Sequence, residues 1–178
     1  LALMPEGEEL EVLNQYDGWV EVDLDGDVGY ASTDYVEISQ QLPKAQTMTE
    51  LKYGQGVSDT RVSLVAYATQ FVGNPYVWGG TSLTNGADCS GFTQSVLRNF
   101  GISVPRVSRE QANTGKGIKS SDMRPGDLIF YTNSKGTINH VAMYIGNGQI
   151  VHAASRRSGI KISTWNYRTP VAIRSMLD

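Results

Sequence analysis

The sequence is poor in the residues that carry much of enzyme chemistry. Its 178 residues include one cysteine and two histidines. One cysteine excludes an internal disulfide, so cysteine pairing says nothing about the cellular compartment. No stretch approaches the ~20 consecutive apolar residues of a membrane-spanning helix, so we expect no such helix in this sequence. The N-terminus lacks a basic region, and Pro5 and four glutamates interrupt its apolar residues by residue 11. We therefore expect no secretory signal within this chain.

Charge is distributed unevenly along the chain. Residues 1–60 contain thirteen acidic and two basic side chains, whereas residues 61–178 contain five acidic and thirteen basic ones. Such asymmetry indicates two modules, of which the basic one suits an anionic polymer and the acidic one could dock on it. Two solvated faces of opposite sign explain the same counts equally well.

The single cysteine, Cys89, stands where a helix is expected to begin. Apolar residues follow it at helical spacing, at positions 92, 96, 97 and 100. Gly101 is a natural stop, and Asp88 is the expected N-cap. The unpaired N–H groups and positive end of a helix favour a thiolate, the form that attacks carbonyls. The alternative is that Cys89 is a small buried hydrophobic residue.

Both histidines fall in one predicted hairpin, formed by residues 140–145 and 149–154 around Gly-Asn-Gly. With a three-residue loop, Ala142 faces His152, and the imidazoles of His140 and His152 project from the same face as diagonal neighbours. A two-residue loop would send them to opposite faces. Taken alone, each histidine could be an ordinary core or surface residue. Their pairing downstream of Cys89 favours a catalytic set.

Several motifs together resemble the NlpC family of bacterial cell-wall cysteine endopeptidases. They are Tyr-Val-Trp-Gly-Gly at 76–80, Asp-Cys-Ser-Gly-Phe at 88–92, Pro-Arg-x-Ser-Arg-x-Gln at 105–111, Arg-Pro-Gly-Asp-Leu-Ile-Phe at 124–130, and His-Val-x-Met-Tyr-Ile-Gly at 140–146. The resemblance runs from about residue 60 to the end, in the family's order. It implies a papain-like α+β fold, in which a helix carrying the cysteine packs on an antiparallel sheet carrying the histidines.

The chemistry assigns a role to each member of the set. Cys89 is the expected nucleophile, His140 the base, and His152 the residue that orients His140. The backbone N–H of Cys89 would hold the oxyanion, and the resemblance implies the Tyr76 hydroxyl as a second donor. One cysteine and two histidines do not have a usual zinc spacing, so we expect neither a metal nor a cofactor.

Polar residues near Cys89 fit a site that reads an amine. Asp88, Ser90 and Ser108 could hold the free α-amino group of an N-terminal L-Ala, with Tyr76 beside them. The alternative for Asp88 is a helix cap alone. Ser108 also forms a capping-box pattern with Gln111, and the resemblance implies a substrate contact for it.

Residues 1–40 resemble a bacterial SH3-like domain, a small β-barrel that binds or positions peptidoglycan peptides. Four short strands are expected, at 9–13, 19–24, 28–31 and 35–38. The opening strand of such a barrel is not evident, so the domain is expected to be incomplete. Its aromatic residues are expected in the barrel core rather than on a ligand shelf: Trp19, Tyr30 and Tyr35.

The remaining residues divide into a linker and the catalytic module. Residues 41–57 lack periodicity and are expected to be the linker, with the peptidase domain at 58–178. A helix is expected over 58–72, with apolar residues at 62, 64, 65, 68 and 72. Further strands are expected at 127–131, 161–164 and 171–174, and Trp78 is expected in the core.

The resemblance implies a peptidoglycan hydrolase that cuts stem peptides between γ-linked D-glutamate and diaminopimelate or L-lysine. An N-acetylmuramoyl-L-alanine amidase and a non-catalytic wall-binding module are the alternatives. The expected partners are stem peptides or muropeptides, with no nucleic acid, and the chain is expected to be a monomer. It would be secreted or wall-associated, or cytoplasmic if it recycles muropeptides.

Overall fold

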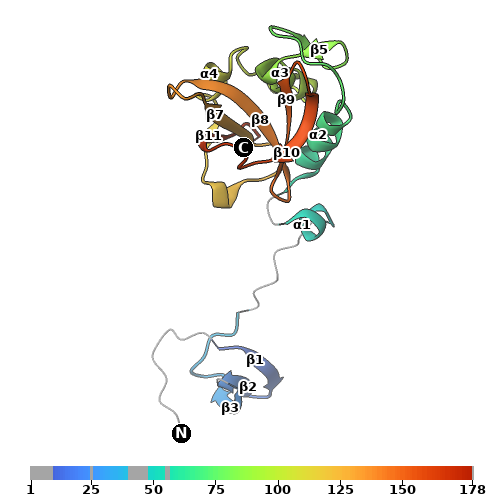
Figure 1. Ribbon diagram of the computed structural model, residues 1–178. Helices are drawn as coiled ribbons and strands as arrows, with labels where there is room; N and C mark the ends of the chain where they lie inside the picture. Colours follow the sequence, from blue (N-terminus) through green and yellow to red (C-terminus); the bar gives the residue numbers. More distant parts are fainter. Residues whose placement is uncertain (1–9, 25, 40–47, 55–56, 178) are drawn as a thin grey trace. The chain divides into compact units, whose positions relative to one another are not determined.

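Three antiparallel strands form the first part of the chain (Figure 1). In the computed structural model, which describes residues 10–24, 26–39, 48–54 and 57–177, they are β1 (Val12–Tyr16), β2 (Trp19–Leu24) and β3 (Asp27–Ser32). The strands pair in the order β1-β2-β3. Asp17-Gly18 turns between the first two, and Gly18 has a φ of 76°, which favours glycine. These strands lie in one of two compact units, Leu1–Ala45 and Gln46–Asp178.

The first unit differs from expectation in three respects. The first strand begins at Val12, and Glu9 lies outside the described residues. Residues 36–39 form no strand, so the predicted strand over 35–38 is wrong. The aromatic side chains expected in a barrel core are exposed, at 52%, 63% and 91%: Trp19, Tyr30 and Tyr35. The residues buried here are Val20 and Val22, which alternate along β2 as a half-buried strand requires.

The second unit is a six-stranded antiparallel sheet with helices (Figure 1). Its helical elements are α1 (Met48–Tyr53), α2 (Asp59–Thr69), α3 (Cys89–Asn99), α4 (Ser108–Gln111) and the 3₁₀ turn η1 (Ser120–Asp122). Its strands are β4 (Thr81–Ser82), β5 (Gly86–Ala87), β6 (Lys116–Gly117), β7 (Leu128–Thr132), β8 (Ile138–Gly146), β9 (Gln149–Ser155), β10 (Gly159–Thr164) and β11 (Pro170–Ser175). The sheet order is β10-β9-β8-β7-β11-β6, and β4 pairs with β5. Helix α1 lies within the segment predicted to be a linker.

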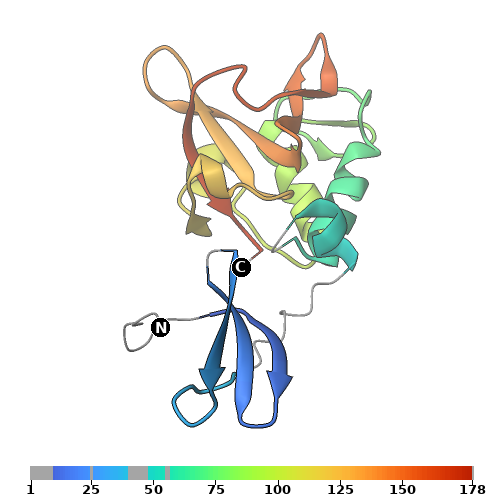
Figure 2. The same cartoon turned by 90° about the horizontal axis from the view of Figure 1, so that it is seen from below.

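The main core lies between the sheet and helices α2 and α3 (Figure 2). Every second side chain of the central strands is buried against these helices, as the two-residue period of a strand requires. The residues between them form a smaller cluster: Ile129, Tyr131, Ala142, Ile150 and Ile173. Helix α3 packs on β8 and β9. Its start is thereby placed beside the hairpin that carries both histidines.

Helix α2 is shorter than predicted, and its buried face is different. It ends at Thr69, and its buried residues are Arg61, Leu64 and Ala68, whereas Val72 is exposed. Arg61 is only 1% exposed. Its guanidinium donates to Asp127 at 2.8 Å, to the Pro125 carbonyl at 2.9 Å and to the Ser175 hydroxyl at 2.7 Å. A buried charge thus takes the place of part of the predicted apolar stripe, because its donors find acceptors in the turn before β7 and on β11.

Replacing Asp127 with asparagine is expected to lower the free energy of unfolding by about 3–5 kcal/mol, because it removes the negative charge that lies 2.8 Å from the buried Arg61 guanidinium. Urea unfolding followed by circular dichroism measures the loss. Asp122→Asn, at an exposed position, is the control and should change stability by less than about 0.5 kcal/mol. An equally small change for Asp127→Asn would contradict a structural role for the pair.

Candidate active site

The start of helix α3 is fixed by Asp88, as predicted from sequence. Its carboxylate accepts from the backbone N–H of Gly91 at 2.7 Å and from that of Gly79 at 2.9 Å. The first of these bonds is the N-cap, and the second ties the helix start to the preceding loop. Gly91 is required there, because a Cβ on it would lie 2.1 Å from the carbonyl oxygen of Gly80. Cys89 is therefore held at the first helical position.

Arg106 clamps the same carboxylate, a contact that the sequence did not suggest. Its two terminal nitrogens reach the two oxygens of Asp88 at 2.9 and 2.7 Å. The guanidinium also donates to the Ser90 hydroxyl at 3.0 Å. Burial by itself would raise the pKa of Asp88, but the hydrogen bonds from Arg106, Gly91 and Gly79 outweigh it and lower that pKa. Asp88 is thus a charged cap, and Ser90 is part of the same network.

The thiol of Cys89 is buried at 8% exposure. Burial raises its pKa, and the negative charge of Asp88 adds to that rise. The backbone N–H groups of Val141, Ser90 and Cys89 itself act in the opposite direction. The expectation that the helix start alone favours thiolate is therefore wrong for the resting site, because desolvation of the charge outweighs the N–H groups. The thiol needs a base to give up its proton.

The two histidines lie where the predicted register places them. Met143 pairs with Val151 and Tyr144 with Ile150, so that the same register, continued along the strands, sets Ala142 opposite His152. The turn itself differs: Gly146 pairs with Gln149 around a two-residue loop, and a bulge at the intervening residue restores the register. The predicted outcome, two imidazoles on one face, is confirmed.

A chain of hydrogen bonds runs through the histidine pair. Nε2 of His140 lies 2.7 Å from Nδ1 of His152, and Nε2 of His152 lies 3.0 Å from the Ser163 hydroxyl. If His140 is to accept a proton at its remaining nitrogen, Nδ1, then its Nε2 must carry hydrogen and donate to His152. His152 must in turn carry hydrogen on Nε2 and donate to Ser163. One tautomer of each ring satisfies the whole chain.

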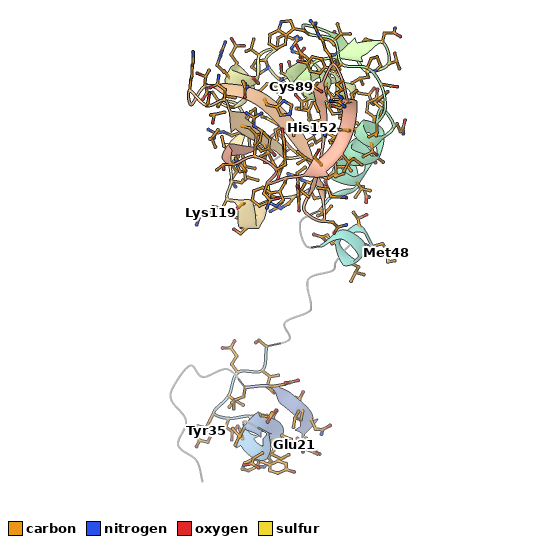
Figure 3. All side chains as sticks on the ribbon, in the orientation of Figure 1. Glu21, Tyr35, Met48, Cys89, Lys119 and His152 are labelled. Carbon is orange, nitrogen blue, oxygen red and sulfur yellow. The ribbon has the colours of Figure 1, made fainter. Side chains whose placement is uncertain are left out.

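Two contacts connect the thiol with this pair. Val141, whose N–H points to the thiol, directly follows His140. Tyr167 packs its ring against that of His152 at 5.3 Å. Burial raises the pKa of Tyr167, and the charge of Cys89 adds a smaller rise. Figure 3 shows Cys89 on α3 and His152 on β9 at the same end of the unit. Cys89 and the two histidines thus share one site.

Aromatic and cationic side chains surround the imidazoles. The Tyr131 ring lies 6.0 Å from that of His140, and the Arg168 guanidinium lies 5.7 Å from the centre of the Tyr131 ring. Burial, His152 and Arg168 lower the pKa of His140 to about 3. Burial, Lys161 and Arg168 lower that of His152 to about 4. Both rings are therefore neutral at pH 7, as a proton acceptor must be.

The pH profile of kcat/KM is expected to keep its acid limb well below 6.5. Protonation of His140 removes the base, and because burial and Arg168 oppose that protonation, activity is lost only as the pH falls towards about 3–4. Initial rates over pH 3–8, with folding checked at each pH, measure the limb. An acid limb at 6.5 or above would contradict neutral, buried imidazoles.

Tyr76 lies close to the thiol, and Trp78 does not lie in the core. The pKa of Tyr76 is raised first by burial and then by the charges of Cys89 and Asp88, so its hydroxyl is within electrostatic range of both. Trp78 is 75% exposed, and the expectation that it is buried is wrong. Gly80 has no room for a Cβ, which would lie 2.4 Å from the carbonyl oxygen of Gly86. This close approach holds the Tyr76 segment against the start of α3.

The predicted capping box at Ser108 is wrong. Ser108 is the first residue of α4, Val107 is its N-cap, and no side chain caps the helix. Gln111 instead reaches α3: its amide donates to the carbonyl of Ser90 at 3.1 Å and accepts from the Thr93 hydroxyl at 2.9 Å. Ser108 itself is 7% exposed. Through Gln111, the motif therefore braces α3 rather than α4.

An antiparallel sheet carrying two histidines, packed against a helix that begins with the cysteine, defines a papain-like α+β fold. Residues 73–173, more than half of the chain, match the NlpC/P60 family. The chain belongs to the NlpC/P60 family.

Individual relatives agree with this assignment. The gamma-D-glutamyl-L-lysine dipeptidyl-peptidase of Bacillus subtilis (strain 168) is 41% identical over 107 residues, which are 59% of this chain and 36% of that protein. The chain thus spans about a third of that relative's length. The crystal structure of an NlpC/P60 family protein from Bacillus cereus matches with a TM-score of 0.63 and 27% identity, over 95% of this chain and 54% of that one. The peptidoglycan hydrolase RipB from Mycobacterium tuberculosis matches with a TM-score of 0.60 and 26% identity, over 77% of this chain and 75% of that one.

The sequence did not assign four residues that line or support this site: Arg106, Ser163, Tyr167 and Arg168. Arg106 stood in a quoted motif without a role. Ser163 stood in a predicted strand, and its place beside His152 depends on the pairing of β10 with β9.

No helix in the described residues is both long and apolar enough to cross a membrane.

Proposed function

We propose that this chain is a cysteine endopeptidase that cuts peptidoglycan stem peptides between the γ-linked D-glutamate and the third residue, diaminopimelate or L-lysine. The observation that carries the proposal is the capped, buried Cys89 beside the His140–His152 pair. The name of the Bacillus subtilis relative supports the bond, because it specifies a γ-D-glutamyl-L-lysine linkage.

Cys89, His140 and His152 form the proposed catalytic triad. Nδ1 of His140 takes the thiol proton as the sulfur attacks the amide carbonyl, giving a thioester with the glutamyl side and an imidazolium. The imidazolium returns the proton to the leaving amine of the third residue. Water then attacks the thioester, with His140 again as base. His152 holds the tautomer of His140 throughout, and the Ser163 hydroxyl accepts from His152.

The oxyanion would be held by the backbone N–H of Cys89 and the hydroxyl of Tyr76. The backbone N–H of Cys89 lowers the pKa of its own thiol, and after burial the charge of Cys89 raises the pKa of Tyr76, so both groups lie near the sulfur. They would stabilise the charge that develops on the carbonyl oxygen in the transition state. The pKa of Tyr76 is raised, so its hydroxyl keeps the proton that it must donate.

Asp88, Ser90, Ser108 and Tyr76 are proposed to contact the stem peptide. Asp88 already receives both ends of the Arg106 guanidinium and two backbone N–H groups. An amine of the substrate would therefore have to compete for a carboxylate, Asp88, that already accepts several hydrogen bonds. A strict demand for a free N-terminal L-Ala receives little support from this arrangement, and we favour a wall endopeptidase that accepts intact muropeptides.

The organisation of the chain follows from the same proposal. Residues 1–40 would be a partial SH3-like module that targets the wall, residues 41–57 a linker, and residues 58–178 the peptidase domain. The chain would act as a monomer on stem peptides or muropeptides, outside the cytoplasm or at the wall. A recycling enzyme, by contrast, would act in the cytoplasm and need the free amine.

Digestion of purified tri- and tetrapeptide stems, with and without muramic acid on L-Ala, tests the function. Mass spectrometry should find muramyl-L-Ala-γ-D-Glu and L-Ala-γ-D-Glu as products. Cleavage of free-amine stems alone would assign a dipeptide-releasing recycling enzyme. Release of an intact stem from muramic acid would instead assign an amidase. Absence of all cleavage, while iodoacetamide still alkylates Cys89, would contradict the proposal.

A further inference from the structure

A hollow lies in the second unit, and Cys89 is not part of its lining. It has a volume of about 700 Å³ and is bounded by β6, η1 and β11. Figure 3 shows Lys119, which lines it, at the end of the unit opposite Cys89. None of the residues assigned to catalysis lines it. The hollow is therefore separate from the peptidase site.

The hollow forms because the sheet ends there in a very short edge strand. Strand β6 has two residues and pairs with β11 only through Gly117–Arg174 and Lys116–Ser175. A Cβ on Gly117 would lie 2.7 Å from a terminal nitrogen of Arg174. Glycine at this position leaves room for the guanidinium, which also donates to the carbonyl of Ala112 at 2.7 Å. Strands β6 and β11 thereby hold the Arg174 guanidinium at the rim of the hollow.

The lining is strongly cationic. It contains five basic residues, Arg61, Lys116, Lys119, Arg124 and Arg174, and two acidic ones, Asp122 and Asp127. One of the two carboxylates, Asp127, is already bound by Arg61. Lys116 and Lys119 are exposed, and neither forms an ion pair within the described part of the chain. An excess of positive charge with mobile lysine heads attracts anions.

The other residues of the lining indicate which class of anionic ligand fits the hollow. Its apolar residues are aliphatic: Ile118, Val171, Ala172 and Ile173. Among the described residues that line it there is no aromatic side chain on which a nucleobase could stack, whereas proteins that bind single-stranded nucleic acid rely on such stacking. Guanidinium and ammonium groups match phosphate oxygens, and the aliphatic residues can contact the methylene groups between the phosphates of a polymer that has no bases.

We propose that this hollow binds a wall polymer that carries one phosphodiester per repeat on a polyol backbone. The inference rests on the proposed function, since it places the enzyme at the cell wall. The hollow would hold the enzyme on the polymer while Cys89, at the other end of the unit, acts on stem peptides. Lys116 and Lys119 make the exposed contacts, and Arg174, on β11 opposite Gly117, lines the same edge.

Binding of a purified glycerol-phosphate oligomer, measured by isothermal titration at low and moderate salt, tests this site. The double variant Lys116→Glu/Lys119→Glu should bind about tenfold more weakly, with a shallower dependence on salt, because two phosphate contacts are lost. Arg98→Glu/Lys135→Glu is the matched control: it makes the same change in net charge at two exposed positions outside the hollow. It should bind within about twofold of the wild type.

Three results would overturn the inference. They are no binding by the wild type, equal weakening by the two double variants, and tighter binding of a single-stranded oligonucleotide with the same number of phosphates. Hydrolysis of a small soluble stem peptide is measured in parallel and should be unchanged in both double variants. Loss of polymer binding with full hydrolysis separates this site from the peptidase. Absence of hydrolysis in the wild type would instead refute the proposed function, whatever the polymer does.

Discussion

Replacing Cys89 with serine is expected to reduce turnover of a stem peptide by at least ~10³-fold while the protein stays folded. Burial raises the pKa of the Cys89 thiol, and the backbone N–H groups of Val141, Ser90 and Cys89 offset part of that rise. A hydroxyl is far harder to ionise there, and neutral His140 is too weak a base to compensate. The loss corresponds to about 4 kcal/mol of transition-state stabilisation. Steady-state kinetics on a tripeptide stem measures it.

Two controls make the Cys89 result interpretable. Thermal unfolding should show that Cys89→Ser keeps the wild-type transition, since serine is nearly isosteric and the Asp88 cap is untouched. Substrate binding by the inactive variant, measured by titration, should remain close to the wild-type value. Retention of even a tenth of the activity in the serine variant would rule out cysteine catalysis.

The two histidines are expected to differ in importance. His140→Ala removes the group that accepts the thiol proton and should abolish measurable turnover. His152→Ala removes only the partner 2.7 Å from Nε2 of His140 and should leave a measurable remnant of turnover. An orienting residue contributes less than the base itself, because the imidazole still samples the productive angle. Single-turnover rates at saturating substrate separate this chemical effect from binding.

Ser163→Ala is expected to have the smallest effect on turnover of the three variants in this series. It removes the acceptor 3.0 Å from Nε2 of His152, and water can replace that acceptor because Ser163 is half-buried. A loss of less than about tenfold is therefore expected. If His152→Ala proved more damaging than His140→Ala, the roles of the two histidines would be reversed. If both retained wild-type rates, the triad would be wrong.

Local signals were enough to predict the core of the site. The helix beginning at Cys89, its cap at Asp88 and the hairpin of His140 and His152 each depend on residues close together in sequence. The spacing of Ala142 and His152 around Gly-Asn-Gly predicted the face on which the rings meet, although the turn reaches that register through a bulge. Helical and strand periods account for these successes because both follow from neighbouring residues.

The parts that could not be predicted depend on contacts between distant segments. Arg61 is a charged residue in a helix whose valines were expected to be buried. Its own burial depends on Asp127, 66 residues away. Arg106 reaches Asp88 across 18 residues. Gln111 matched a local capping box but bonds to α3 instead. In each case a side chain found a tertiary partner that outweighed its local preference, and one sequence contains no sign of that partner.

The most direct test of the proposed function is the mass of the acyl group carried by Cys89 during turnover. The enzyme is mixed with a muramyl tripeptide, quenched in acid within the first turnover, and analysed by intact mass and peptide mapping. The proposal predicts a thioester on the Cys89 peptide that carries muramyl-L-Ala-γ-D-Glu, with the third residue already released. An adduct of muramic acid without L-Ala would identify an amidase, and turnover with no adduct on Cys89 at any quench time would contradict the cysteine mechanism.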